Sequence, residues 1–370
     1  EGEGAMKRRI GVGLAAGGAA VALVVGGLAI RQARQPESSD KGLEELAASL
    51  DDLSALNQLD QLGRFGPPPP GASTTLTEAR SVEGSTERTV RYGPIPLAAG
   101  TATTPSQAAA FVAGVEVPCA DCYVTGVRPD LVYEDGRSAN LDTGVMLHHL
   151  VLVRANRPDP TCTGESPLAD YGQRFFGAGN ERTHGDFPAG FGYHLEKDPI
   201  HAIYEIMNHE AADKAVYLSV KVTYVPDTQS DMKAVTPIWL DENNCATSEY
   251  TVPAGPSKQG TRWTSSISGQ VVAAAGHVHD GGVKTVLTNE SRGEHLCTST
   301  AGYEAQPSSA HHHGSLASMS LCVGEPLGTV RTGEVLLLDT YYDVAESKSD
   351  VMGIMLAYVH EGEVAETPGK

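Results

Sequence analysis

The chain has 370 residues, which is too long for one small module and fits two domains of about 100–150 residues with additional segments. Its formal net charge of −19 argues against a nucleic-acid partner, because a phosphate backbone requires a basic surface. The 41 glycines and 22 prolines favour a turn-rich β protein over a helix bundle. Thirteen His, seven Met and six Cys direct attention to metal chemistry, since these side chains hold soft and borderline metals.

The amino-terminal segment, residues 1–36, contains an uncharged apolar run over residues 10–30. Basic residues flank this run on both sides: Lys7, Arg8 and Arg9 before it, Arg31 and Arg34 after it. A helix of this length reaches about 30 Å, enough to cross a bilayer. We therefore expect a membrane anchor here, with a cleaved secretory signal or a buried helix as alternatives.

Residues 37–90 are typical of a linker. Within it, leucines recur every three or four residues, which predicts a helix with one apolar stripe. They are Leu43, Leu46, Leu50, Leu53, Leu56, Leu59 and Leu62. The stripe either packs on the chain's own body or makes a short self-association seam. The run Pro67 to Pro70 ends this helix and starts a stiff spacer.

From Arg91 onward, apolar residues recur with a period of two, which indicates β strands. In the stretch 215–225, every second residue from Val216 to Tyr224 is apolar. The stretches 145–153, 200–209, 270–279, 335–342 and 351–359 have a similar pattern and are separated by turn residues. We expect an all-β fold of two tandem antiparallel β-sandwich domains, jelly-roll-like, over residues 91–228 and 229–370, preceded by the anchor helix and the linker helix.

Six cysteines, at positions 119, 122, 162, 245, 297 and 322, predict disulfides in a chain that leaves the cytoplasm. The preferred pair is Cys297 with Cys322. Cys119 and Cys122 could instead form half of a zinc knuckle, although the chain has no second such pair.

Two histidine pairs are candidate metal ligands. His277 and His279 stand two apart at a strand end, so their imidazoles point to the same side, about 6.6 Å apart along the chain. His148 and His149 are adjacent in an apolar run, where neighbouring side chains normally face opposite sides. A shared metal at a bulge or strand end would satisfy both imidazoles. The alternatives are an ordinary surface pair for the first, and one buried and one exposed imidazole for the second.

Three further groups complete the candidates. His209 ends the strand over residues 200–209, with His194 and His201 as alternatives nearby. Met352 lies on the last long strand, where a methionine is usually a core residue but can also serve as a thioether ligand that favours Cu(I) over zinc. The run His311 to His313 is interpreted as a solvated loop.

In this order, the elements resemble the copper type II, ascorbate-dependent monooxygenases, the family of peptidylglycine α-hydroxylating monooxygenase and dopamine β-monooxygenase. That family has an adjacent His pair, a His after a strand, a His-x-His pair and a Met after Ser-Asp; the last motif is Ser349-Asp350-Val351-Met352 here. The stretch from Phe187 to Tyr193 is similar to the family's segment before the third His. The resemblance spans roughly residues 110–360.

The chain also resembles a less characterised branch, the plant stress-upregulated nodulin-like proteins and their bacterial relatives. The stretches that carry this likeness are 174–181, 205–209 and 216–218. We expect the chain to belong to this branch.

The resemblance implies two copper ions, one in each sandwich. His148, His149 and His209 would hold the first, which supplies an electron. His277, His279 and Met352 would be catalytic and hold the second, which binds dioxygen and hydroxylates a C–H bond. The implied partners are a small-molecule or peptide substrate and an external reductant.

The chain departs from the peptidylglycine enzyme where that enzyme binds its substrate carboxylate. Ala275, Ile354 and Leu356 stand at the positions of its Arg, Asn and Tyr. Methyl groups cannot replace a guanidinium clamp, which argues against peptidylglycine as substrate. The expected function is a membrane-anchored or secreted extracytoplasmic copper monooxygenase. The alternatives are a non-catalytic copper-binding or redox protein on the same fold, and a binding or adhesion module whose His sites hold zinc or nothing.

Overall fold

A computed structural model describes residues 73–82, 84–116, 118–163, 172–228, 231–243, 245, 248–304 and 315–364. The expected anchor at residues 10–30, the leucine-striped helix at 43–62 and the run 311–313 lie outside the described residues. Within the described part of the chain, no helix is both long and apolar enough to span a bilayer.

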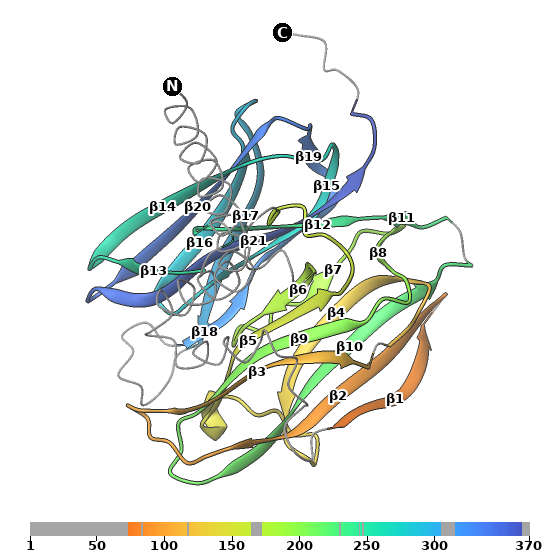
Figure 1. The fold of residues 1–370 in the computed structure, drawn as a ribbon. Helices are drawn as coiled ribbons and strands as arrows, with labels where there is room; N and C mark the ends of the chain where they lie inside the picture. The colour runs from red at the N-terminus through yellow and green to blue at the C-terminus, as the bar shows by residue number, and fades with distance from the viewer. Residues whose placement is uncertain are drawn as a thin grey trace, which may run out of the picture. The chain divides into compact units, whose positions relative to one another are not determined.

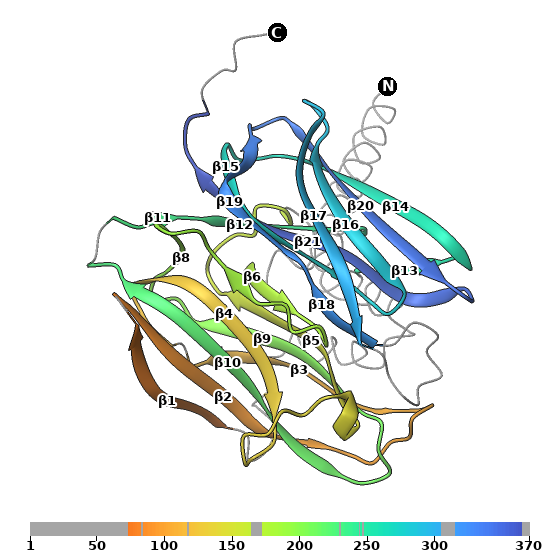
Figure 2. The same ribbon diagram turned by 180° about the vertical axis from the view of Figure 1, so that it is seen from behind.

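The first part of the chain forms two sheets (Figures 1 and 2). One has the order β1 (Ser73–Val82), β2 (Ser85–Leu97), β10 (Lys214–Pro226), β4 (Cys122–Val132), β8 (Phe191–Leu195) and β11 (Lys233–Ala234), with β7 (Gly185–Asp186) beside β4. The other has the order β3 (Ser106–Val115), β9 (Ile200–Asn208), β5 (Val145–Arg154) and β6 (Gln173–Ala178). A short 3-10 helix, η1 (Leu141–Thr143), precedes β5.

The second part also forms two sheets. One has the order β12 (Thr236–Asp241), β21 (Lys348–Glu361), β15 (Gly269–Val278) and β19 (Leu321–Val330), with β13 (Glu249–Val252) beside β21. The other has the order β14 (Gly255–Thr264), β20 (Val335–Val344), β16 (Gly282–Asn289), β17 (Glu294–Glu304) and β18 (Ser315–Met319). The chain passes from the first pair of sheets to the second between β11 and β12.

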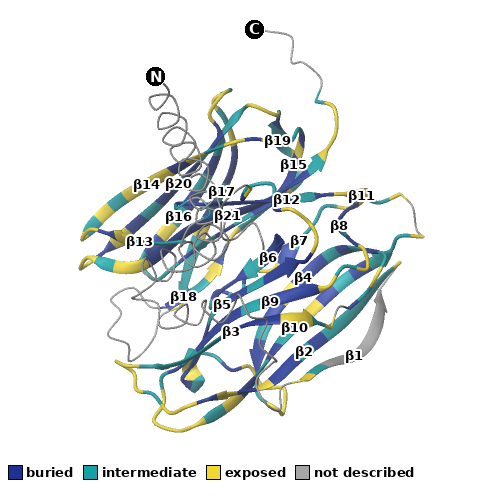
Figure 3. Ribbon diagram, in the orientation of Figure 1, coloured by how far each residue is buried: buried dark blue, intermediate teal, exposed yellow. Residues whose placement is uncertain are grey.

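The observed strands follow the sequence pattern closely, which confirms the expected all-β class. All six stretches predicted as strands are strands, as β5, β9, β10, β15, β20 and β21. In β10, the side chains from Val216 to Tyr224 are buried at every second position, as predicted (Figure 3). Strands begin at Ser73, ahead of residue 91, where the first domain was expected to start.

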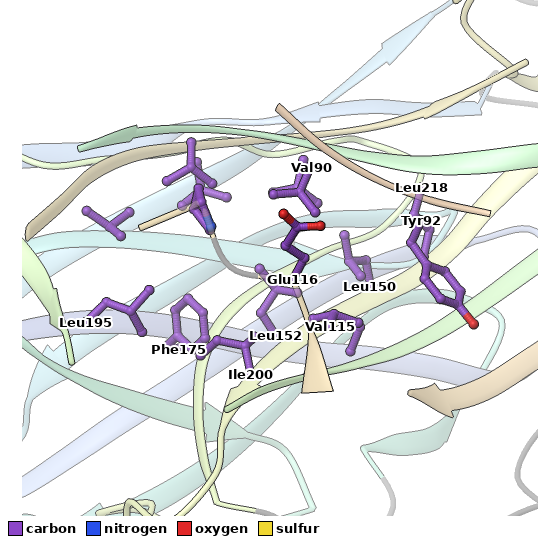
Figure 4. A pocket seen from close by; sticks show the side chains of 16 residues that line it. Val90, Tyr92, Val115, Glu116, Leu150, Leu152, Phe175, Leu195, Ile200 and Leu218 are labelled. Atoms are coloured by element: carbon purple, nitrogen blue, oxygen red, sulfur yellow. The ribbon is translucent and has the colours of Figure 1, made fainter. Parts of the chain in front are cut away.

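The core of the first sandwich lies between its two sheets. A small apolar cavity of about 60 Å³ remains there, lined by Leu152 and Phe175 from one sheet and Leu195 and Leu218 from the other (Figure 4). Because apolar cavities of this size stay dry, it is a packing gap within the core.

The two sandwiches share an apolar interface. Trp239, Ile354 and Leu356 of the second sandwich belong to the same buried cluster as the interior of the first. The hydroxyl of Tyr358 donates a hydrogen bond of 2.8 Å to the carbonyl of Phe175 across this interface. Two of the three positions that correspond to a substrate clamp in the peptidylglycine enzyme, Ile354 and Leu356, are thus occupied by packing residues of this interface.

The six cysteines form three disulfides, which confirms the prediction that they are oxidised. Cys297 pairs with Cys322 as expected, and Cys119 with Cys122, which removes the zinc-knuckle alternative. The third, Cys162–Cys245, joins the two sandwiches covalently. Three disulfides are typical of proteins in an oxidising compartment outside the cytoplasm.

Candidate metal centre

A β-bulge brings His148 and His149 to the same side of β5. The register of β5 against β9 pairs Leu147 with Ile206 and His149 with Glu205, so His148 is an extra residue. An extra residue interrupts the alternation of side chains, and the two imidazole rings lie 4.2 Å apart between centroids. This is the bulge that the metal-binding interpretation of the pair required.

His277 and His279 share one face of the second sandwich. Val278 between them is fully buried on the opposite face, within the sandwich. The two imidazoles are 5.3 Å apart between ring centroids. The alternation of a regular strand places both side chains on one side, as the spacing predicted, and this side faces the first sandwich.

The two pairs meet in one place. His149 Nε2 is 3.1 Å from His279 Nε2, and the rings of His148 and His279 are 4.9 Å apart. We refer to His148, His149, His277 and His279 as the histidine cluster. The resemblance implied one ligand set within each sandwich; instead the pairs adjoin, because β5 and β15 both turn these side chains toward the neighbouring sandwich.

The cluster brings three imidazoles close to the spacing of ligands around one metal ion. Ring nitrogens of His148, His149 and His279 all lie within 4.8 Å of one another. Metal–imidazole bonds of about 2.0–2.1 Å place two nitrogens of one ion about 3 Å apart, which matches the 3.1 Å between His149 and His279. In addition, the buried Nε2 of His277 has no hydrogen-bond partner among the residues that the structure describes. An unpaired buried imidazole nitrogen is costly unless a ligand satisfies it, so the residues present fit a bound metal ion.

Glu205, on β9, supports the first histidine pair. Its Oε2 lies 3.0 Å from Nδ1 of His148 and 3.3 Å from Nδ1 of His149. Gln107 donates a hydrogen bond to the other carboxylate oxygen. Although burial acts in the opposite direction, the charge and hydrogen bonds of His148 and His149 hold the pKa of Glu205 well below its usual range. The group is thus an ionised carboxylate.

The imidazoles differ in how readily they take a proton. Burial opposes charge on His148, but the hydrogen bond and the negative charge of Glu205 outweigh it and raise the pKa of His148. Burial and the neighbouring His148 lower the pKa of His149 to about 4. Burial and the other imidazoles also hold the pKa of His279 well below its usual value. His149 and His279 are therefore neutral at pH 7, the form that binds metals.

Hydrogen bonds fix the orientation of the second pair. Nδ1 of His277 donates to Oε1 of Glu181 at 2.9 Å, and the amide of Gly179 donates to the same oxygen. Nδ1 of His279 donates to the backbone carbonyl of Asp350. A proton held at Nδ1 leaves the lone pair of Nε2 available, the arrangement found around ligating histidines.

A pocket of about 420 Å³ opens beside the cluster. His148, His277 and His279 line it, together with Met146 and the first residues of β21. Lys348, the first residue of this strand, donates a hydrogen bond of 2.9 Å to the carbonyl of Asp280. A small organic molecule could thus reach the imidazoles from this side.

The other predicted ligands lie differently. His209 follows β9, where its amide donates to the carbonyl of Gly144, and it is not one of the three histidines whose nitrogens converge. Met352 is buried in the apolar interface cluster. Ile354 pairs with His277 across the two strands, so their side chains share one face of the sheet. Met352 stands two residues from Ile354 and therefore lies on the same face.

The two alternatives to His209 are engaged elsewhere. The ring of His194 stacks on Tyr123 at 4.6 Å. Nδ1 of His201 accepts a hydrogen bond from the amide of Gly114.

Sequence reasoning missed Glu205, Glu181 and Met146 as residues of the site. A signal existed for Glu205, which is a lone carboxylate within the apolar strand 200–208. Met146 stands two residues before His148 and therefore on its side of the strand.

We expect the substitution Glu205→Gln to weaken metal binding about 10- to 100-fold, the usual cost of losing a carboxylate that orients ligating histidines. Competition with a chelator of known affinity would measure it. Glu196→Gln, on the surface beside His194, is the matched control. An unchanged affinity in Glu205→Gln would show that the carboxylate does not orient the pair.

This double β-sandwich protein with a histidine cluster has relatives among known proteins. Residues 202–362 match the model of the family "Stress up-regulated Nod 19". The match confirms the resemblance to this branch over these residues.

Two curated fungal proteins are also similar. The chain is 28% identical over 266 residues to "Probable copper-dependent oxygenase M1" of Phoma sp. (strain ATCC 20986 / MF5453), covering 67% of this chain and 66% of that protein, just under two thirds of its length. It is 28% identical over 251 residues to "Probable copper-dependent oxygenase clz3" of Cochliobolus lunatus, covering 63% of this chain and 78% of that protein.

Among solved structures, the chain is paired with the major capsid protein P2 from bacteriophage PM2. The identity is 11%, the coverage 79% of this chain and 98% of that one, and the TM-score 0.22. A likeness this weak carries no conclusion.

Proposed function

We propose that this protein is an extracytoplasmic copper monooxygenase that hydroxylates a C–H bond of a small-molecule or peptide substrate. The observation that carries the proposal is the convergence of His148, His149 and His279, with their ring nitrogens within 4.8 Å of one another. Two relatives named as copper-dependent oxygenases support copper as the metal and oxygenation as the reaction.

We propose one ion at this place. His148, His149 and His279 would hold it, and His277 or Met352 would complete the set. Imidazole ligands with a thioether nearby suit copper in both Cu(I) and Cu(II), whereas magnesium and calcium prefer oxygen ligands. An ion at the rim of a pocket of about 420 Å³ would be reachable by dioxygen, substrate and reductant.

The reaction consumes one dioxygen, one C–H bond, two electrons and two protons, and yields one hydroxyl group and one water. Bound copper would supply the activation of dioxygen. The chain's own residues hold the imidazoles in place: Glu205 fixes the first pair and Glu181 fixes His277. The apolar interface between the sandwiches packs beside the imidazoles and excludes water from the part of the cluster that does not face the pocket.

The test is ascorbate-driven oxygen uptake by the copper-loaded protein, followed by mass spectrometry of candidate substrates for a gain of one oxygen atom. Uptake that is lost in His149→Ala and retained in His194→Ala supports the proposal. Copper binding without uptake would instead support the non-catalytic copper or redox protein. Purified protein that contains zinc and retains no copper would support the binding module.

A further inference from the structure

The hydroxyl of Tyr342 lies between β15 and β21, beside His279. The ladder between β15 and β21 is paired as far as Val278 with Gly353. Beyond this point the amide of His279 donates a hydrogen bond of 2.7 Å to the hydroxyl of Tyr342. The same hydroxyl donates a hydrogen bond of 2.6 Å to the carbonyl of Met352. Tyr342 therefore bridges the two strands at the residue that carries a cluster imidazole.

The bridge comes from the opposite sheet. Tyr342 is on β20, and its side chain crosses the interior of the second sandwich with only 2% of its surface exposed. A tyrosine hydroxyl carries its proton at neutral pH, so it can donate one hydrogen bond and accept another.

The bridge sets the separation of the two strands. Two hydrogen bonds of 2.7 and 2.6 Å through one oxygen hold the outer nitrogen and oxygen about 4 Å apart, whereas a direct bond would bring them to about 2.9 Å. His279 is thus held away from β21 on its backbone side.

The ring of His279 is held at a second point. Its Nδ1 donates to the carbonyl of Asp350, a residue with φ of 63°, in the left-handed region that non-glycine residues rarely adopt. The peptide of Asp350 therefore turns its oxygen toward the imidazole. Backbone and ring together direct Nε2 at His149, 3.1 Å away.

We propose that Tyr342 is a positioning residue of the metal centre, which sets the reach of His279 toward the first sandwich by separating β15 from β21. The proposal rests on the metal centre proposed above. Tyr342 itself touches neither metal nor substrate. Its loss would change the geometry of the centre and leave all the ligands present.

The test is Tyr342→Phe, which removes one hydroxyl and keeps the ring. We expect Cu(II), added alone, to bind at least 10-fold more weakly and to give an altered electron paramagnetic resonance spectrum, with the same number of ions at saturation. Tyr341→Phe, on the same strand, is the matched control and should change neither. A normal spectrum and affinity in Tyr342→Phe, with lower stability alone, would reduce the residue to a structural role.

A second measurement does not depend on the variant's folding. In the metal-free wild-type protein, hydrogen exchange of the His279 amide should be slow, because its hydrogen bond goes to a buried phenol. Exchange as fast as in an exposed loop would overturn the bridge. The affinity for Zn(II), measured alone, tests the same geometry without any oxygen chemistry. If Tyr342→Phe weakens Zn(II) binding but the wild-type protein takes up no oxygen, the proposed function is wrong and the positioning role of Tyr342 still holds.

Discussion

Replacing His279 with alanine is expected to remove all bound copper, and replacing His149 is expected to do the same. The two residues belong to different sandwiches, but their Nε2 atoms are 3.1 Å apart and would share one ion. An ion that loses one of three imidazoles keeps too few ligands to stay bound at micromolar concentration. Elemental analysis after dialysis, with spin quantitation of Cu(II), would measure the number of ions per chain.

His194→Ala is the control, since this imidazole stacks on Tyr123 outside the cluster. The competing expectation comes from the family resemblance, which implied one ion in each sandwich. In that case each variant would keep one ion of two. Retention of one ion per chain in either variant would therefore contradict a shared centre.

The sequence predicted the strands and the side of the strand that His277 and His279 share, because both depend on local geometry. Alternating apolar residues define the face of β10, and a His-x-His spacing places two imidazoles on one side. The cost of burying two adjacent imidazoles in one strand indicated a bulge or a strand end, and the structure has a bulge at His148.

The meeting of the two pairs was not predicted, because it depends on which outer face of each sandwich is covered. A hint lies in β21, where every residue from Val351 to Val359 is buried. A strand with one solvated face alternates, whereas a continuous apolar run indicates burial on both faces. The run therefore pointed to a neighbour against the outer face of this sheet, which is the first sandwich.

The choice of His209 shows a second limit. Spacing along β9 places Glu205 and His209 on the same face only if the strand continues, but β9 ends at Asn208. The bulge in β5 then brings His149 opposite Glu205. A register shift between β5 and β9 thus makes Glu205, and not His209, the neighbour of His148 and His149. No single stretch of sequence encodes such a shift.

Arg174→Met is expected to destabilise the protein by about 3–5 kcal/mol, because it leaves buried carboxylates without their cation. The guanidinium lies 2.8 Å from Asp159 of the first sandwich and 3.7 Å from Asp241 of the second, and the side chains of both carboxylates are 1% exposed. It also lies over the ring of Trp239, 5.0 Å from the centroid. Arg174 therefore joins the two sandwiches near the disulfide Cys162–Cys245.

Thermal unfolding would show this as a fall of about 10 °C in Tm. Arg262→Met is the matched control: its ion pair with Glu290 is exposed, and such pairs contribute at most about 1 kcal/mol. Equal, small decreases in Tm in the two variants would contradict the expectation that the ion pairs of Arg174 stabilise the interface between the sandwiches. Because the histidine cluster draws ligands from both sides of that interface, Arg174→Met should also weaken copper binding, although Arg174 contacts none of the imidazoles among its described partners. Stability and metal affinity would then fall together, as expected of a centre assembled by the docking of two sandwiches.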